Sequence, residues 1–173
     1  MTSPSYFTPN FPDFRYEYHT LTVSSADSTS ESRNTFTVYL TTPINNVVQA
    51  SLVAAHIHTL STVEHIFVSV DELNTHFNDV GSLTQPNEST TPASRKAFAS
   101  LLVDSTTHGN SDVEITYKND YPNTTQYIRA IDINKLTIKL LDENGNTIPR
   151  STNDTRTHLI FRFVTRSKNI PPY

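Results

Sequence analysis

The chain of 173 residues has no cysteine, no tryptophan and only three glycines. Without cysteine it can form neither disulfides nor thiolate metal sites. Its glycines, Gly81, Gly109 and Gly145, are too scattered to form a phosphate-binding loop or a Gly-x-Ser-x-Gly nucleophile elbow. Charged residues make up 17% of the chain and the formal net charge is -4, a composition that argues against a strongly basic nucleic-acid binder. No apolar run approaches the ~20 residues of a membrane span.

The first 15 residues combine prolines with aromatic side chains. They contain neither the charged region nor the apolar core of a secretory signal peptide, and we expect none here. Proline holds the backbone extended and removes hydrogen-bond donors, so the segment 1–15 is predicted to be an extended N-terminal arm. Each aromatic ring would gain about 1.5–3 kcal/mol by burial. The arm is therefore expected to pack either over its own domain or on a neighbouring subunit.

The remaining sequence is typical of antiparallel β-structure. Leu136, Ile138 and Leu140 alternate with polar residues, which is the period of a strand with one buried face. A turn sequence follows at 142–146, where Asn-Gly tolerates the positive φ of a tight turn. A second apolar run extends over 159–164. We interpret the stretch Ile133–Thr165 as a final hairpin of two long strands.

Other strands are predicted upstream from the same alternation. They are Tyr16–Val23, Thr35–Leu40 (closed by Pro43, with a turn at Asn45-Asn46), Val47–Leu60 (with a helix as the alternative), His65–Val70, Lys96–Val103, Val113–Tyr117 and, as a short strand or turn, Thr125–Arg129. Between them we expect loops over Ser24–Asn34 and Asn78–Ser94 and one or two helical turns over Asp71–Phe77. About eight turn-bounded strands predict an all-β fold, a two-sheet antiparallel sandwich with single jelly-roll wiring. The domain is expected to span 16–168, with a C-terminal tail over 169–173.

Few residues are arranged as a catalytic or metal site would require. His56 and His58 project from one face of a predicted strand, and Glu64 follows, a spacing similar to that of the cupin metalloenzymes. The glycines that flank both cupin motifs are absent, however, so two histidines near solvent at a strand end are the favoured interpretation. Asp71 and Glu72 are adjacent and cannot flank a scissile bond as a glycosidase pair does. We predict no catalytic residue, no cofactor and no metal, and hence no enzyme.

Three segments in this order resemble the single jelly-roll minor capsid and penton proteins of large double-stranded DNA viruses. They are Phe36–Leu40 with Pro43–Val48 and Leu52–Ala55, then His65–Asn74, then Ile133–Gly145 with His158–Phe163. The family shares a "strand, Pro-Ile-x-Asn-Val, strand" opening and a "Leu-x-Ile-x-Leu-x-Asp-x-x-Gly" sequence near the end. The resemblance covers most of residues 35–165.

This resemblance implies a structural role in a virion. The protein would pack beside other capsid subunits, the major and minor capsid proteins, either as a penton in a homopentameric ring or as a minor protein that cements the shell. It implies assembly in the host cytoplasm or nucleus, with no direct nucleic-acid contact and no membrane span. Independently of the family, aromatic and proline-rich ends favour docking on a neighbour. The predicted partner contacts are Tyr6, Phe7, Phe11, Phe14, Ile170, Pro171, Pro172 and Tyr173.

Two other classes of function remain open at this point. A carbohydrate- or receptor-binding β-sandwich would use exposed aromatics beside polar loops, and Tyr117, Tyr121 and Tyr127 could serve. A cupin-like metalloenzyme would use His56 and His58.

Overall fold

The computed structural model describes residues 14–27, 34–59, 63, 65–73, 97–102, 113–118, 126–142, 144–149 and 157–168. Within these ranges the chain is all-β, and it forms seven strands and two short 3-10 turns. The strands are β1 (Phe14–Ser24), β2 (Thr35–Thr59), β3 (His65–Val70), β4 (Ala99–Leu102), β5 (Val113–Lys118), β6 (Gln126–Leu141) and β7 (His158–Lys168). The turns are η1 (Ser25–Asp27) and η2 (Asp71–Leu73). None of the described residues belongs to a helix that could span a membrane.

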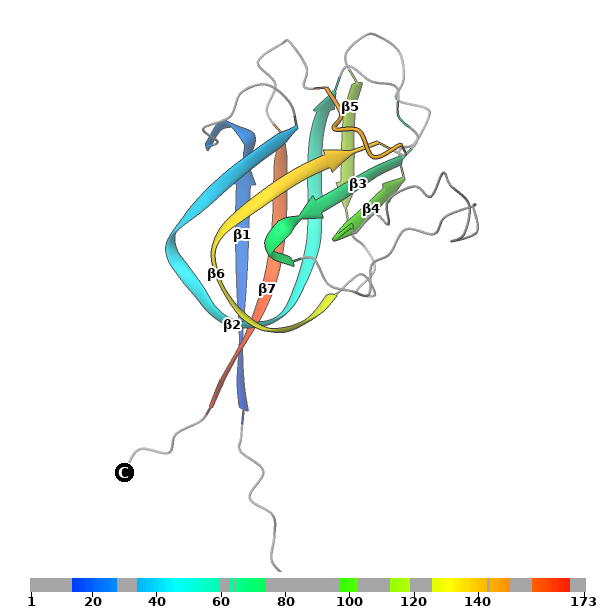
Figure 1. Cartoon of the computed structure of the whole chain (residues 1–173). Helices are drawn as coiled ribbons and strands as arrows, with labels where there is room; N and C mark the ends of the chain where they lie inside the picture. Colours follow the sequence, from blue (N-terminus) through cyan, green and yellow to red (C-terminus); the bar gives the residue numbers. More distant parts are fainter. Residues whose placement is uncertain are drawn as a thin grey trace, which may run out of the picture.

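All the strand pairs are antiparallel, in the order β1-β7-β2-β6-β3-β4, with β5 also paired to β2. The sheet curls because β2 is long and changes its partners along its length. Its residues 35–50 pair with β6, its residues 47–56 pair with β7 on the other side, and its residues 54–59 pair with β5. Figure 1 shows the result as two crossing layers: β1, β7, the second half of β2 and β5 form one, and the first half of β2, β6, β3 and β4 form the other. The predicted all-β antiparallel class is confirmed.

The bend in β2 lies where the sequence predicted the end of one strand. Pro43 does not close the strand, since β2 runs through it to Thr59, and this prediction was wrong. The β2–β6 register is irregular from Tyr39 to Gln49, so Pro43 falls where no regular ladder requires its missing N–H. Asn46 adopts a φ of 57°, a left-handed conformation that asparagine tolerates better than most residues. The predicted turn is therefore a bulged corner inside one continuous strand.

The two strands of the predicted final hairpin do not pair with each other. β6 pairs with β2 and β3, whereas β7 pairs with β1 and β2. The turn itself is present: Gly145 has a φ of 80°, and the Asn146 amide donates to Asp142 Oδ1 at 2.7 Å. After a single bridge between Leu141 and Thr147, the chain leaves this layer and enters the other. The hairpin prediction was wrong because alternation reports which face of a strand is buried and not which strand lies beside it.

A single apolar core lies between the layers. Phe36, Leu136 and Ile138 come from one layer and Phe161 and Phe163 from the other, and all are nearly or fully buried. The Phe161 ring contacts Phe98, just before β4, at a centroid distance of 5.9 Å and Phe163 at 6.0 Å. Full burial of such side chains contributes about 1.5–3 kcal/mol each, so this shared core holds the layers together.

Other predicted elements can be compared where the structure describes them. Val47–Leu60 is strand up to Thr59, and the helical alternative is wrong because this segment is the centre of the β1–β7–β2–β5 layer. The predicted strands at 16–23, 65–70, 96–103 and 113–117 correspond to β1, β3, β4 and β5. Residues 125–129 were predicted to form a short strand or turn, but Gln126 begins the long strand β6. The helix expected over 71–77 is present as η2 over its first three residues, and most of the loops lie outside the described residues.

Candidate functional site

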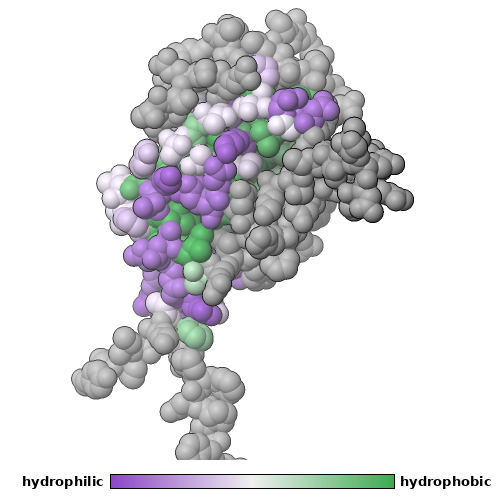
Figure 2. Space-filling view, viewed as in Figure 1, coloured by the Kyte–Doolittle hydropathy of each residue, from purple (hydrophilic) through white to green (hydrophobic). Residues whose placement is uncertain are grey.

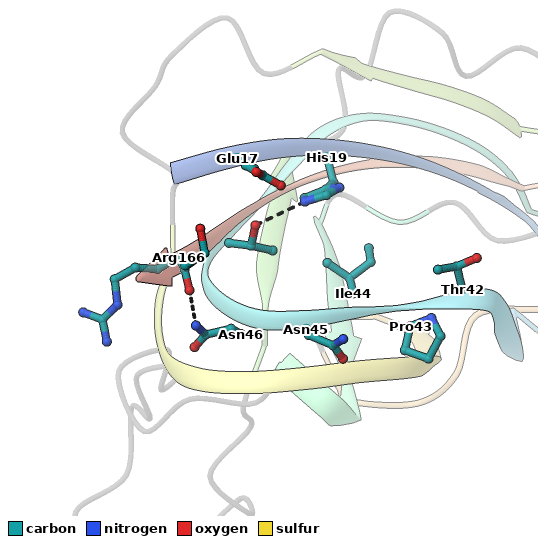
Figure 3. Close-up of a pocket in the computed structure, with 10 residues that line it drawn as sticks. Glu17, His19, Thr42, Pro43, Ile44, Asn45, Asn46 and Arg166 are labelled. Carbon is teal, nitrogen blue, oxygen red and sulfur yellow. Dashed lines mark hydrogen bonds between the residues drawn. The ribbon is translucent and has the colours of Figure 1, made fainter. Parts of the chain in front are cut away.

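An open hollow lies beside the bend of β2. Its volume is about 420 Å³, and it is formed by three strands. β1 contributes Glu17 and His19, and β7 contributes residues 165–167. The bend contributes residues 42–46. Figure 3 shows His19 directed from β1 toward the bend, with Ile44 and Pro43 beneath it and the Arg166 side chain extending away.

Hydrogen bonds hold the walls of this hollow in place. His19 Nε2 lies 3.2 Å from the Thr165 hydroxyl on β7. Asn46 on β2 joins this strand to β6 and β7. Its backbone N–H donates to Asp132 Oδ1 at 2.7 Å, and its side-chain amide donates to the Arg166 carbonyl. The hollow thus presents a carboxylate, an imidazole and amides above an apolar floor. These groups can hydrogen-bond a hydroxyl-rich ligand or a peptide, and they include no activated nucleophile.

An exposed aromatic row follows β1 away from the body. Phe14, Tyr16 and Tyr18 are 38%, 50% and 74% exposed and project from the same side of the strand. The Arg166 guanidinium lies 4.5 Å from the centre of the Phe14 ring, a cation–π contact between β1 and β7. Figure 1 shows β1 and β7 extending together below the two layers, so the described parts of both chain ends leave the sandwich side by side. Side chains of this kind, large and exposed on an edge strand, mark an interaction surface.

The opposite layer presents a more polar surface. Tyr39 is 70% exposed there, and its register partner on the neighbouring strand is the charged residue Lys135. Figure 2 shows hydrophilic residues over much of the described part of this side, with smaller apolar areas between them. Among the side chains that the structure describes, exposed aromatics are therefore concentrated on the β1–β7 ribbon.

The residues predicted to contact partners are mostly beyond the described ranges. Phe14 is described, and it is the first residue of β1. The others lie outside the described residues, namely Tyr6, Phe7, Phe11, Ile170, Pro171, Pro172 and Tyr173. Tyr16 and Tyr18 extend the same row; they belong to the predicted strand Tyr16–Val23 but are not among the predicted partner contacts. The sequence pattern that could have identified them is the alternation of Phe14, Tyr16 and Tyr18, which places all three on one side of a strand.

The histidines of the His-x-His sequence lie on the outer face of β2. Their Nε2 atoms are 2.8 Å apart, and His56 Nδ1 lies 3.3 Å from the Thr116 hydroxyl on β5. Glu64 lies outside the described residues. Across the part of the chain that the structure describes, no three histidine or acidic side chains are already gathered as a metal centre. Of the tyrosines considered for carbohydrate binding, Tyr117 is on β5, Tyr127 is on β6, and Tyr121 lies outside the described residues.

Comparison with known proteins adds no relative: no family model matches the chain, and no curated protein is significantly similar to it. The functional argument therefore depends on the residues and the fold.

Proposed function

We propose that the protein is a structural component of a viral capsid, a penton or minor capsid protein that packs against other capsid subunits. The observation that carries the proposal is the exposed row Phe14, Tyr16 and Tyr18 on a strand that projects from the sandwich and continues into the aromatic, proline-rich segment 1–13. Aromatic anchors of this kind supply much of the binding energy of protein interfaces. Proline has already restricted the segment, which lowers the entropy lost on docking.

The strand pairing supports jelly-roll wiring. If β2 is counted as two strands on either side of its bend, the described part of the chain has eight strands in two groups of four. One group is then β1, β7, the second half of β2 and β5, and the other is the first half of β2, β6, β3 and β4. Successive strands alternate between layers at several points, as two linked Greek keys require. Since folds host many functions, this wiring supports the capsid role only together with the aromatic surface.

The experiment is to measure the molar mass of the tag-free chain by light scattering over a range of concentrations. We expect assembly beyond the monomer, and a discrete pentamer for a penton. Deletion of residues 1–13, or the variant Tyr16→Ser/Tyr18→Ser, should give a monomer with an unchanged circular-dichroism spectrum. Tyr39→Ser is the matched control, because Tyr39 is about as exposed but lies on the other layer. Equal assembly by the deletion variant would contradict assembly through this surface. A chain that is monomeric throughout would contradict the penton role and would favour a cementing role or a binding module.

The hollow supports a second candidate, a carbohydrate- or receptor-binding module. Its carboxylate, imidazole and amide groups suit hydroxyl-rich ligands. A glycan array with the isolated protein tests this, and Glu17→Gln/His19→Gln should abolish any signal. Binding that survives this variant would place the ligand elsewhere.

A further inference from the structure

The outer face of the layer formed by β1, β7, β2 and β5 carries a histidine group that the assembly role does not use. His56 and His58 are two residues apart near the C-terminal end of β2, so both side chains leave the same face. Figure 1 places this end of β2 far from the strand ends that lead to the two termini. The group is therefore independent of the projecting β1–β7 ribbon.

The two imidazoles converge through the nitrogen atoms that bind metals. Their Nε2 atoms lie 2.8 Å apart, and the ring centroids are 4.6 Å apart in an edge arrangement. Two imidazole nitrogens bound to one tetrahedral zinc ion at ~2.1 Å would lie roughly 3.4 Å apart. A small rotation of either ring therefore converts the contact between the rings into a shared site for an ion.

A neighbouring strand orients one of these ligands. His56 Nδ1 lies 3.3 Å from the hydroxyl of Thr116, which is the register partner of His56 on β5. A partner at the second ring nitrogen fixes the orientation of a metal-binding histidine. This contact leaves Nε2 directed toward His58.

The strand on the other side supplies a third imidazole. His158 is the register partner of His56 on β7, and directly opposed residues of an antiparallel pair project from the same face. Opposed Cα atoms in such a pair are about 4.5–5.5 Å apart. His158 is exposed and His56 and His58 are half-buried, so the His158 side chain has to rotate toward the other two when an ion binds.

We propose that His56 and His58, with His158 as a third ligand on binding, form a site for a divalent transition-metal ion such as Zn²⁺. Imidazole favours zinc, copper and nickel over the hard cations Mg²⁺ and Ca²⁺, which prefer oxygen ligands. The proposal does not depend on the capsid role.

The test is isothermal titration of the tag-free full-length chain with Zn²⁺, after removal of metals. We expect saturable binding of one ion per chain and no response to Mg²⁺. His56→Gln and His58→Gln should each weaken Zn²⁺ binding by at least about tenfold, and Thr116→Val by a similar factor. His65→Gln, a half-buried strand histidine in the other layer, is the control and should leave the affinity unchanged.

Cu²⁺ electron paramagnetic resonance supplies a readout that does not depend on affinity. The spectrum of the unsubstituted chain should show three nitrogens coordinated to the copper ion, and that of His158→Gln should show two. Absence of saturable Zn²⁺ binding, or unchanged affinity in both His56→Gln and His58→Gln, would overturn the site. An unchanged nitrogen count in His158→Gln would overturn the third ligand.

Discussion

At the scale of single residues, the buried Asn34 connects several segments of this fold. It is 1% exposed, and its side-chain amide donates to the carbonyls of Pro149 at 3.2 Å and His58 at 3.4 Å. Its side-chain oxygen accepts from the Thr157 hydroxyl at 3.0 Å, and its backbone carbonyl accepts from Leu140 at 2.9 Å. Asn34 thus joins the start of β2 to the ends of β2 and β6 and to the residue before β7.

We expect Asn34→Ala to lower the free energy of unfolding by about 2–4 kcal/mol, because it leaves several buried polar groups without a partner. Chemical denaturation followed by circular dichroism measures this. Asn134→Ala, at an exposed position of β6, is the control and should change stability by less than about 0.5 kcal/mol. Equal effects of the two substitutions would show that the contacts of Asn34 contribute little.

At the scale of elements, the bend of β2 determines how the sheet closes into two layers. Asn46 is the one non-glycine residue with positive φ in the described part of the chain, and its neighbour Asn45 is not in this conformation. The bend also forms one wall of the hollow. The backbone conformation at Asn46 is therefore linked both to the layers and to the site.

We expect Asn46→Gly to be more stable than Asn46→Ala by about 1 kcal/mol, since glycine accepts a positive φ and alanine does not. Both variants lose the side-chain hydrogen bond to the Arg166 carbonyl. The difference between their stabilities therefore measures the cost of the positive φ at this position. At Asn45 the order should reverse, because glycine in an ordinary strand conformation is less stable than alanine. Thermal and chemical unfolding of the four variants measures their stability. If the glycine and alanine variants have the same order of stability at both positions, this explanation is wrong.

At the scale of the whole molecule, the shared core predicts that the layers unfold together. Phe161 is fully buried on β7 and contacts Phe98 beside β4, which belongs to the other layer. A residue that both layers contact should stabilise both equally. The aromatic row on β1 lies outside this core.

We expect Phe161→Ala to cost about 3–5 kcal/mol and to keep a single unfolding transition. Tyr18→Ala, at an exposed position, should cost less than about 1 kcal/mol. Because the chain has no tryptophan, tyrosine fluorescence and far-ultraviolet circular dichroism are the two probes to compare. Transitions that do not coincide would show that the layers are separate folding units.

The sequence by itself determined the fold class and most strand positions. Alternation such as that of Leu136, Ile138 and Leu140 depends only on the geometry of one strand beside a buried face, and it is readable without a structure. It also located the turn at Gly145 and the His56–His58 pair on one face. For the candidate site, it identified Phe14 but treated Tyr16 and Tyr18 as ordinary strand residues.

Only the tertiary structure decided which strands lie side by side. β6 and β7 are consecutive along the chain but lie on opposite sides of β2 instead of pairing with each other, because the register of β2 is interrupted at its bend and the sheet curls there. The hollow, the contacts of Asn34 and the position of His158 opposite His56 all depend on this curl. They involve residues roughly a hundred positions apart, and local alternation carries no information about contacts at that separation.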